Sequence, residues 1–222
     1  MTQIQRFSKR EELANSLSHG MGTILAIVGL VLLVIFSAKT GSARHIVSFS
    51  IFGATMVVLY LSSTLNHALH AGKTKEFFHN FDQIAIFLLI AGTYTPLALV
   101  ALNGDWGWTM FGCQWGFAFA GIIAKLFMTN KFEKGVNIFF IASYIIMGWM
   151  LLFFLLPLFR HIPITGIVFI FLGGFCYTLG TKFFKLKKLQ YAHFIWHLFV
   201  IGGTVFHWIA ILFYVLPIGI TI

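Results

Sequence analysis

The sequence predicts an all-α membrane protein, a bundle of seven transmembrane helices with a cytoplasmic N-terminus and an external C-terminus. Two observations lead to this fold class. The first is composition: 59% of the 222 residues are hydrophobic and only 9% are charged, whereas soluble domains carry about a quarter charged residues. The second is the gathering of apolar residues into seven runs, each near the ~20 residues that a bilayer core requires. A water-soluble globule is therefore excluded.

Each apolar run is expected to be a helix, because backbone polar groups in lipid must find partners within their own segment. The runs cover residues 14–37, 46–68, 83–102, 106–128, 136–157, 163–182 and 192–216. Residues 1–12 are polar and form a short cytoplasmic segment. The first run is too long for a cleaved signal peptide, so we expect a retained span. A single seven-helix membrane domain is expected to fill residues 1–222.

The Lys and Arg residues predict the orientation. Twelve lie in the N-terminal segment and in the second, fourth and sixth connecting regions, and three lie on the other side. The twelve are Arg6, Lys9, Arg10, Lys73, Lys75, Lys125, Lys131, Lys134, Lys182, Lys185, Lys187 and Lys188, and the three are Lys39, Arg44 and Arg160. Positive residues favour the cytoplasmic side, so the N-terminus is placed inside. This bias also accounts for the net charge of +9 without a nucleic-acid partner.

Small residues within the runs are expected to let helices approach closely. They are Gly22, Gly29, Gly92, Gly116, Gly121, Gly173, Gly174, Gly202 and Gly203. Cys113 and Cys176 lie inside separate apolar runs and are expected to be packing residues, with no disulfide framework.

The strongest chemical signal is the pair His193 and His197 at the start of the last run. Residues four apart lie on one face of a helix, so both imidazoles can point at one place. Two neutral imidazoles with this spacing form half of a tetrahedral zinc site. The alternative is a pair of interfacial histidines that hydrogen-bond neighbouring helices.

Polar residues from three other runs are predicted at the same depth of the membrane. The second run ends with Ser63 and His67 one turn apart, and Asp82 stands before the third run. The first run begins with Glu12, Asn15, Ser18 and His19. Polar groups in a membrane are costly, and a shared cluster is the least costly way to satisfy them.

The expected metal ligands are His67, His193 and His197. Three histidines leave the fourth position of a tetrahedral zinc open for water, which is the arrangement of a catalytic site. Asp82 could hold or deprotonate that water, or it could cap the third helix. Ser63 could orient a ligand or donate to an oxyanion, or it could bond back to the carbonyl of residue 59. For His67 the alternative is a side chain that extends to the headgroups.

The remaining histidines are expected to lie outside the site. His45, His70, His79 and His161 lie in or beside connections and should be solvated. His207 is ten residues beyond His197, about 15 Å along a helix, and is expected to be a buried hydrogen-bonding residue or part of an outer cavity. His19 is expected to pack, with contact to a ligand as the alternative.

Together these residues resemble the haemolysin III family, the bacterial branch of the progestin and adiponectin receptor superfamily. The resemblance covers nearly the whole chain. It rests on Glu12-x-x-Asn15-x-x-Ser18-His19, Ser63-x-x-x-His67, Asp82 with the later Ala91-Gly92-Thr93-Tyr94-Thr95-Pro96, and His193-x-x-x-His197. It implies seven spans, a cytoplasmic N-terminus and Zn²⁺ held by the three histidines. It also implies Ser63 and Asp82 as partners, and kinship with membrane hydrolases such as alkaline ceramidases.

We therefore expect a multi-pass protein of the bacterial inner membrane with a zinc site near the cytoplasmic face. The expected activity is hydrolysis of an amide or ester in a lipid by a zinc-activated water, so the partners are membrane lipids and a lipid or fatty-acyl substrate. The alternative is a non-enzymatic protein of membrane homeostasis, transport or cytolysis with a structural zinc. A secreted pore-former is disfavoured, because it needs a soluble form and this chain is too apolar to have one.

Overall fold

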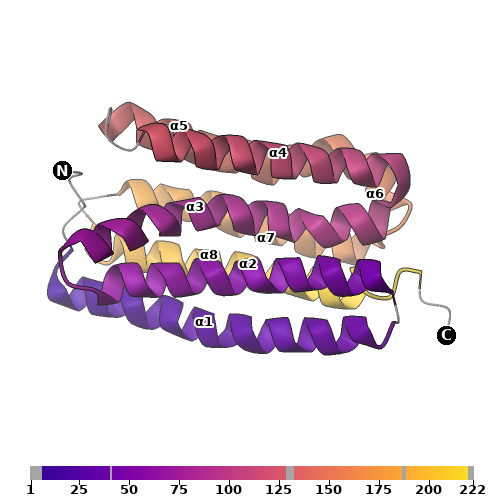
Figure 1. Ribbon diagram of the computed structural model, residues 1–222, viewed down its shortest axis with the longest axis horizontal. Helices are drawn as coiled ribbons and strands as arrows, with labels where there is room; N and C mark the ends of the chain where they lie inside the picture. The colour runs from indigo at the N-terminus through magenta and orange to yellow at the C-terminus, as the bar shows by residue number, and fades with distance from the viewer. Residues whose placement is uncertain (1–6, 41, 129–132, 187–188, 220–222) are drawn as a thin grey trace.

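The computed structural model describes residues 7–40, 42–128, 133–186 and 189–219, and within them seven helical segments are long and apolar enough to cross a membrane. They are α1 (Lys9–Ala38), α2 (Ala43–Ala68), α3 (Lys73–Pro96) with the π-helical η1 (Leu97–Leu102), α4 (Gly104–Met128), α5 (Glu133–Trp149) with the 3₁₀-helical η2 (Met150–Phe154) and α6 (Leu155–Phe159), α7 (Ile164–Lys185), and α8 (Ala192–Ala210) with the π-helical η3 (Ile211–Val215). The predicted seven-helix fold is confirmed (Figure 1).

Two helices begin earlier than the apolar runs suggest. α1 begins at Lys9, because Ser8 accepts from the backbone N–H of Glu11 and the Glu11 side chain accepts from the backbone N–H of Ser8, a complete capping box. The predicted polar segment 1–12 therefore overlaps the first turn of α1. α3 begins at Lys73, not near residue 83, and its N-cap is Gly72. Asp82 lies inside α3, so the interpretation of Asp82 as a helix cap is wrong.

α3 is the most enclosed span of the described chain. Within its most apolar window 72% of the residues are buried, against 22% for α4 and 33% for α1. Figure 1 shows α1, α2 and α8 on one side of the molecule and α4 and α5 on the other, with α3 and α7 between them. The polar first turns of α3 precede the predicted apolar run. Because α3 lies at the centre, these turns contact α1 and α2 through Lys75.

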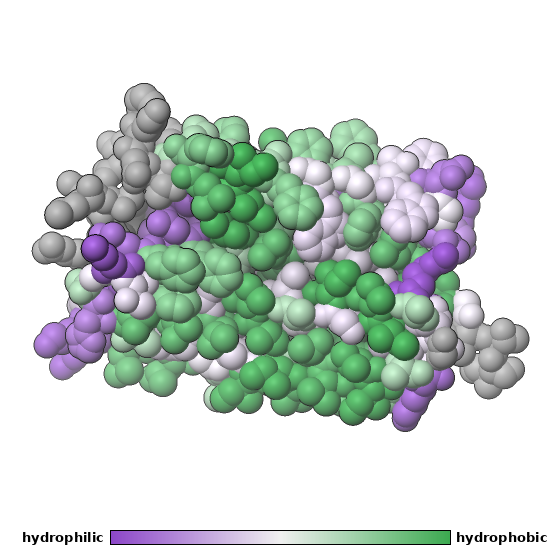
Figure 2. Space-filling model, in the orientation of Figure 1, coloured by the Kyte–Doolittle hydropathy of each residue, from purple (hydrophilic) through white to green (hydrophobic). Residues whose placement is uncertain are grey.

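The outer surface is apolar over the length of the helices. Large hydrophobic side chains such as Leu17 on α1, Phe127 on α4 and Phe153 on η2 are 65%, 77% and 82% exposed. Figure 2 shows a hydrophobic central belt with hydrophilic residues gathered at the two ends. Such a belt is stable in lipid and would aggregate in water, so this is a multi-pass membrane protein.

Candidate metal centre

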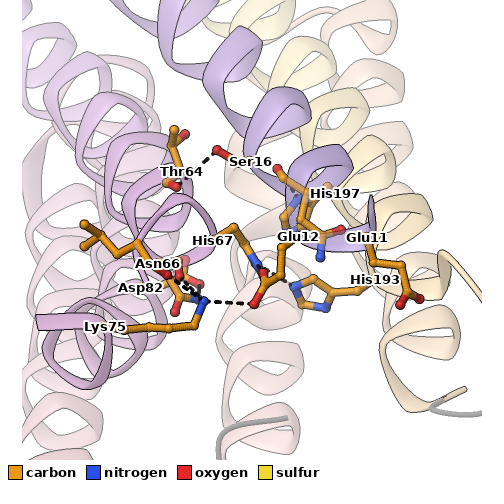
Figure 3. Close-up of polar contacts among 12 residues, drawn as sticks. Glu11, Glu12, Ser16, Thr64, Asn66, His67, Lys75, Asp82, His193 and His197 are labelled. Atoms are coloured by element: carbon orange, nitrogen blue, oxygen red, sulfur yellow. Dashed lines mark hydrogen bonds and ion pairs between the residues drawn. The ribbon is translucent and has the colours of Figure 1, made fainter. Parts of the chain in front are cut away.

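The three predicted ligand histidines meet at the end of the bundle where α1, α3 and α8 begin and α2 and α7 end, here called the N-terminal end. One ligand atom of each of His67, His193 and His197 lies within 4.8 Å of the others. The Nε2 atoms of His67 and His193 are 3.2 Å apart. The ring centroids of His193 and His197 are 4.5 Å apart, as expected for neighbours one turn apart on α8. Figure 3 shows the imidazoles pointing toward one another.

The geometry and the chemistry of these donors fit a metal ion. Two nitrogens bound to a tetrahedral zinc at 2.0–2.1 Å lie about 3.3 Å apart, close to the His67–His193 separation of 3.2 Å. The Nδ1 of His67 donates to Glu12 Oε2 at 2.6 Å. The Nδ1 of His197 lies 3.0 Å from Ser18 Oγ and 3.2 Å from the backbone oxygen of Asn15. These contacts turn each Nε2 toward the cluster and make it the free ligand atom.

A buried ammonium group supports this arrangement. Lys75 Nζ donates to Glu12 Oε1 at 2.8 Å and to the backbone oxygens of Asn66 and Leu69 at 2.8 and 3.3 Å. It thereby satisfies one carbonyl group in the last turn of α2 and that of the C-cap residue, and ties them to Glu12 of α1. The sequence predicted Lys75 only as one of the charges of a connection and predicted no specific role for Glu12. Both residues stand beside the polar cluster of a membrane segment, and this position could have indicated that they take part in it.

Asp82 and Ser63 lie in the same polar group. Asn66 Nδ2 donates to Asp82 Oδ2 at 3.3 Å, and Ser63 lies beside the same carboxylate. Ser63 and Asn66 are buried. The hydroxyl that bonds back to the carbonyl of Leu59, at 2.9 Å, belongs to the neighbouring Ser62.

His19 contacts one of the predicted ligands. Its ring stacks on that of His197 with centroids 3.5 Å apart and meets the ring of Tyr60 edge-on at 5.1 Å. The packing role expected for His19 is therefore seen, and part of its packing surface is His197 itself.

Two of the other histidines differ from expectation. His45 is buried, and its Nε2 donates to the backbone oxygen of Ile218 at 3.0 Å. His79 is half-buried because α3 extends through this position, and its Nε2 lies 2.9 Å from Gln83 Nε2 one turn later. The expectation that these two are solvated is wrong. His70 and His161 are exposed, as predicted.

A cavity lies farther along the bundle, on the side of His207. Its walls come from α3, α5, α7 and α8 and from η1 and η2, and they include Thr93, Tyr94, Trp149 and His207. His207 Nε2 donates to the backbone oxygen of Ile170 at 3.0 Å. Of the two alternatives predicted for His207, the structure shows a partly buried hydrogen bond and a place in the wall of this cavity.

Comparison with known proteins supports this assignment of the fold. The model of the family described as "Haemolysin-III related" matches residues 7–208. The chain is 43% identical to "Hemolysin-3" of Bacillus cereus over 217 residues, covering 98% of this chain and 97% of that protein. It is 43% identical to "Hemolysin-3 homolog" of Bacillus subtilis (strain 168), covering 94% and 96%.

A more distant similarity reaches animals. The chain is 29% identical to the human "Monocyte to macrophage differentiation factor" over 207 residues, covering 90% of this chain and 83% of that protein. The match of the family model over nearly the whole sequence, together with the two bacterial relatives, shows that this chain belongs to the haemolysin III family.

Proposed function

We propose that this protein is a zinc-dependent hydrolase of the bacterial inner membrane that cleaves an amide or ester bond in a membrane lipid. The zinc would be held by His67, His193 and His197 near the cytoplasmic face. One observation carries the proposal. Three imidazoles converge at the N-terminal end of the bundle, and two of them are oriented through Nδ1 by Glu12 and by Ser18. The carboxylate of Asp82, which is not among the ligands, accepts from Asn66, the residue before His67.

The residues around the three histidines supply what lipid hydrolysis needs. When bound, a zinc ion with three protein ligands supplies an activated water at neutral pH and polarises a carbonyl group. Asp82 is the base that accepts the proton of the attacking water, and Asn66 orients its carboxylate through a hydrogen bond, with Ser63 beside it. Glu12 holds the ring of His67, and Lys75 balances the charge of Glu12. A lipid substrate can reach this depth by lateral diffusion.

The orientation in the proposal follows from the distribution of Lys and Arg. A cytoplasmic N-terminus puts the histidine cluster in the inner leaflet. The relatives from two Bacillus species support a bacterial plasma membrane.

A second candidate is a non-enzymatic protein in which zinc fixes the ends of α2 and α8. The observation that favours it is the position of the cavity around His207, which is lined by none of the three ligand histidines. In this case the protein acts in membrane homeostasis, transport or cytolysis, and Asp82 serves only to accept the hydrogen bond of Asn66.

The metal is tested by elemental analysis of protein purified in detergent. We expect about one zinc per chain in the wild type and little zinc in the His193→Ala/His197→Ala double variant. His70→Ala is the matched control, because His70 is exposed at the same end of the bundle. Zinc should also be lost as the pH falls below about 6.5, because protons compete for the imidazole nitrogens. Full zinc content in the double variant would remove these ligands from the proposal.

A further inference from the structure

The ring of Phe7 covers the histidine cluster at the N-terminal end of the bundle. Its centroid lies 4.9 Å from that of His193 and 5.8 Å from that of His67. Phe7 directly precedes Ser8, the N-cap of α1, a position whose apolar side chain often packs on the fourth residue of the same helix. Here the fourth residue is Glu12, which bonds His67 and Lys75. The ring of Phe7 therefore packs on predicted ligands carried by two other helices.

Glu11 fastens the segment that carries Phe7. Its Oε2 accepts from the backbone N–H and the hydroxyl of Ser8 at 3.0 and 2.7 Å. Its Oε1 accepts from the backbone N–H of Tyr191 at 3.1 Å. Tyr191 is the N-cap of α8 and has a φ of 59°, a conformation uncommon outside glycine. The Glu11–Tyr191 bond thus joins the start of α1 to the start of α8, two residues before His193.

His193 is the ligand at which the cluster comes closest to the surface. His67 and His197 are buried, whereas His193 is half-buried. Aromatic rings lie beside His193, with Phe7 at 4.9 Å and Phe184 at 5.8 Å between centroids. The ring of Phe7 therefore lies on the side of the cluster at which His193 is partly exposed.

We propose that Phe7 is a gate through which a transition-metal cation such as Zn²⁺ enters and leaves the centre, held closed by the Glu11–Tyr191 bond. This inference rests on the metal-binding part of the proposed function. A gate is a barrier in both directions, so opening it raises the rate constants of uptake and release by the same factor and leaves the Kd unchanged. A ring that only stabilises the bound metal slows release alone.

The test measures both rates on purified protein in detergent. Uptake is followed with radioactive Zn²⁺ added to metal-depleted protein, and release is followed into an excess of a strong chelator. For Phe7→Ala we expect both rates to rise on the order of tenfold, as for a modest fall in a barrier, with an unchanged Kd. Phe7→Trp keeps an aromatic cover and should stay close to the wild type.

The bond that holds the gate is tested separately, in case Phe7→Ala disturbs folding. Glu11→Ala should speed uptake and release together. Glu11→Gln has a single acceptor oxygen and cannot accept from both Ser8 and Tyr191, so its rates should lie between those of Glu11→Ala and the wild type. Leu13→Ala is the control, since Leu13 is 60% exposed on the same helix. Unchanged rates in Phe7→Ala and Glu11→Ala would overturn the gate, and so would faster release with unchanged uptake. Wild-type protein that binds no Zn²⁺ would overturn the proposed function and the gate with it.

Discussion

At the scale of single residues, Glu12 links a predicted metal ligand to a buried cation. One oxygen accepts from His67 at 2.6 Å and the other from Lys75 at 2.8 Å. Removing a carboxylate and an ammonium from water is costly, and the attraction between them offsets this cost only when the remaining protons have acceptors. Lys75 meets that condition with the carbonyl oxygens of Asn66 and Leu69. Glu12 thus orients His67, and Lys75 provides a hydrogen-bond donor for two backbone carbonyl groups at the end of α2.

The role of Asp82 separates catalysis from a structural metal. Asp82→Asn removes the charge and keeps an oxygen that can accept from Asn66. If Asp82 is the base, turnover should fall by a factor on the order of 10² or more, with zinc content and melting temperature nearly unchanged. Ser63→Ala should show the same pattern with a smaller loss. The measurement is hydrolysis of a panel of ceramide-like lipids and phospholipids in detergent.

The control for this prediction is Asp105→Asn, because Asp105 is exposed at the start of α4. A wild type that hydrolyses nothing in a broad panel, with Asp82→Asn cells indistinguishable from wild-type cells, would favour the structural metal.

At the scale of elements, α3 carries Lys75 and Asp82 to the site, and its packing depends on close approach to α2. A Cβ at Gly92 would meet the side chain of Thr55 on α2. Thr55 is branched at Cβ and its hydroxyl already donates to the backbone oxygen of Phe52 at 2.8 Å, so it has little freedom to move away. Close contact here sets the separation of the middle of α2 from the last turns of α3.

We expect Gly92→Ala to destabilise the protein by about 1–3 kcal/mol, the usual cost of overpacking a helix contact. Gly116→Ala is the matched control, because a Cβ at Gly116 meets no atom within 4 Å. Without a steric clash, an alanine there should be neutral or slightly stabilising in a helix. Thermal melting in detergent compares the two variants. Equal melting temperatures would contradict the proposed tight contact between α2 and α3.

At the scale of the whole molecule, the polar features are divided between the two halves of the bundle. The histidine cluster lies where α1 begins, whereas His207, its cavity and the bond between His45 and Ile218 lie toward the other end. An odd number of spans separates the start of α1 from the end of η3. The start of α1 and the end of η3 therefore face opposite sides of the membrane, and the orientation decides which compartment adjoins the metal centre.

The orientation can be tested with a reporter enzyme that is active only outside the cytoplasm. We expect activity when the reporter is fused after Ile222 and none when it is fused in the connection between α7 and α8. A reporter that is active only outside and one that is active only inside should give opposite patterns at each position. The reverse result would place the histidine cluster at the external face and would contradict the proposed inner-leaflet site.

The sequence by itself determined the seven spans and the pairing of His193 with His197. Both follow from local rules: lipid requires about 20 apolar residues per helix, and residues four apart share a helix face. The place of His67 at the same end of the bundle was also predictable, because the alternation of spans puts the end of α2 on the same side of the membrane as the start of α8. The same rules misplaced the start of α3, since a hydropathy run ends where polar residues begin and these turns are polar yet enclosed.

Only the tertiary structure decided which groups touch the histidines. The bonds of Glu12 to His67 and Lys75, the stacking of His19 on His197 and the cover of Phe7 over His193 join residues from different helices. Such contacts depend on how each helix is rotated about its axis and how far it is shifted along its neighbour. Hydropathy and spacing within one segment carry no information on these two quantities, because they are set by the packing of side chains between helices.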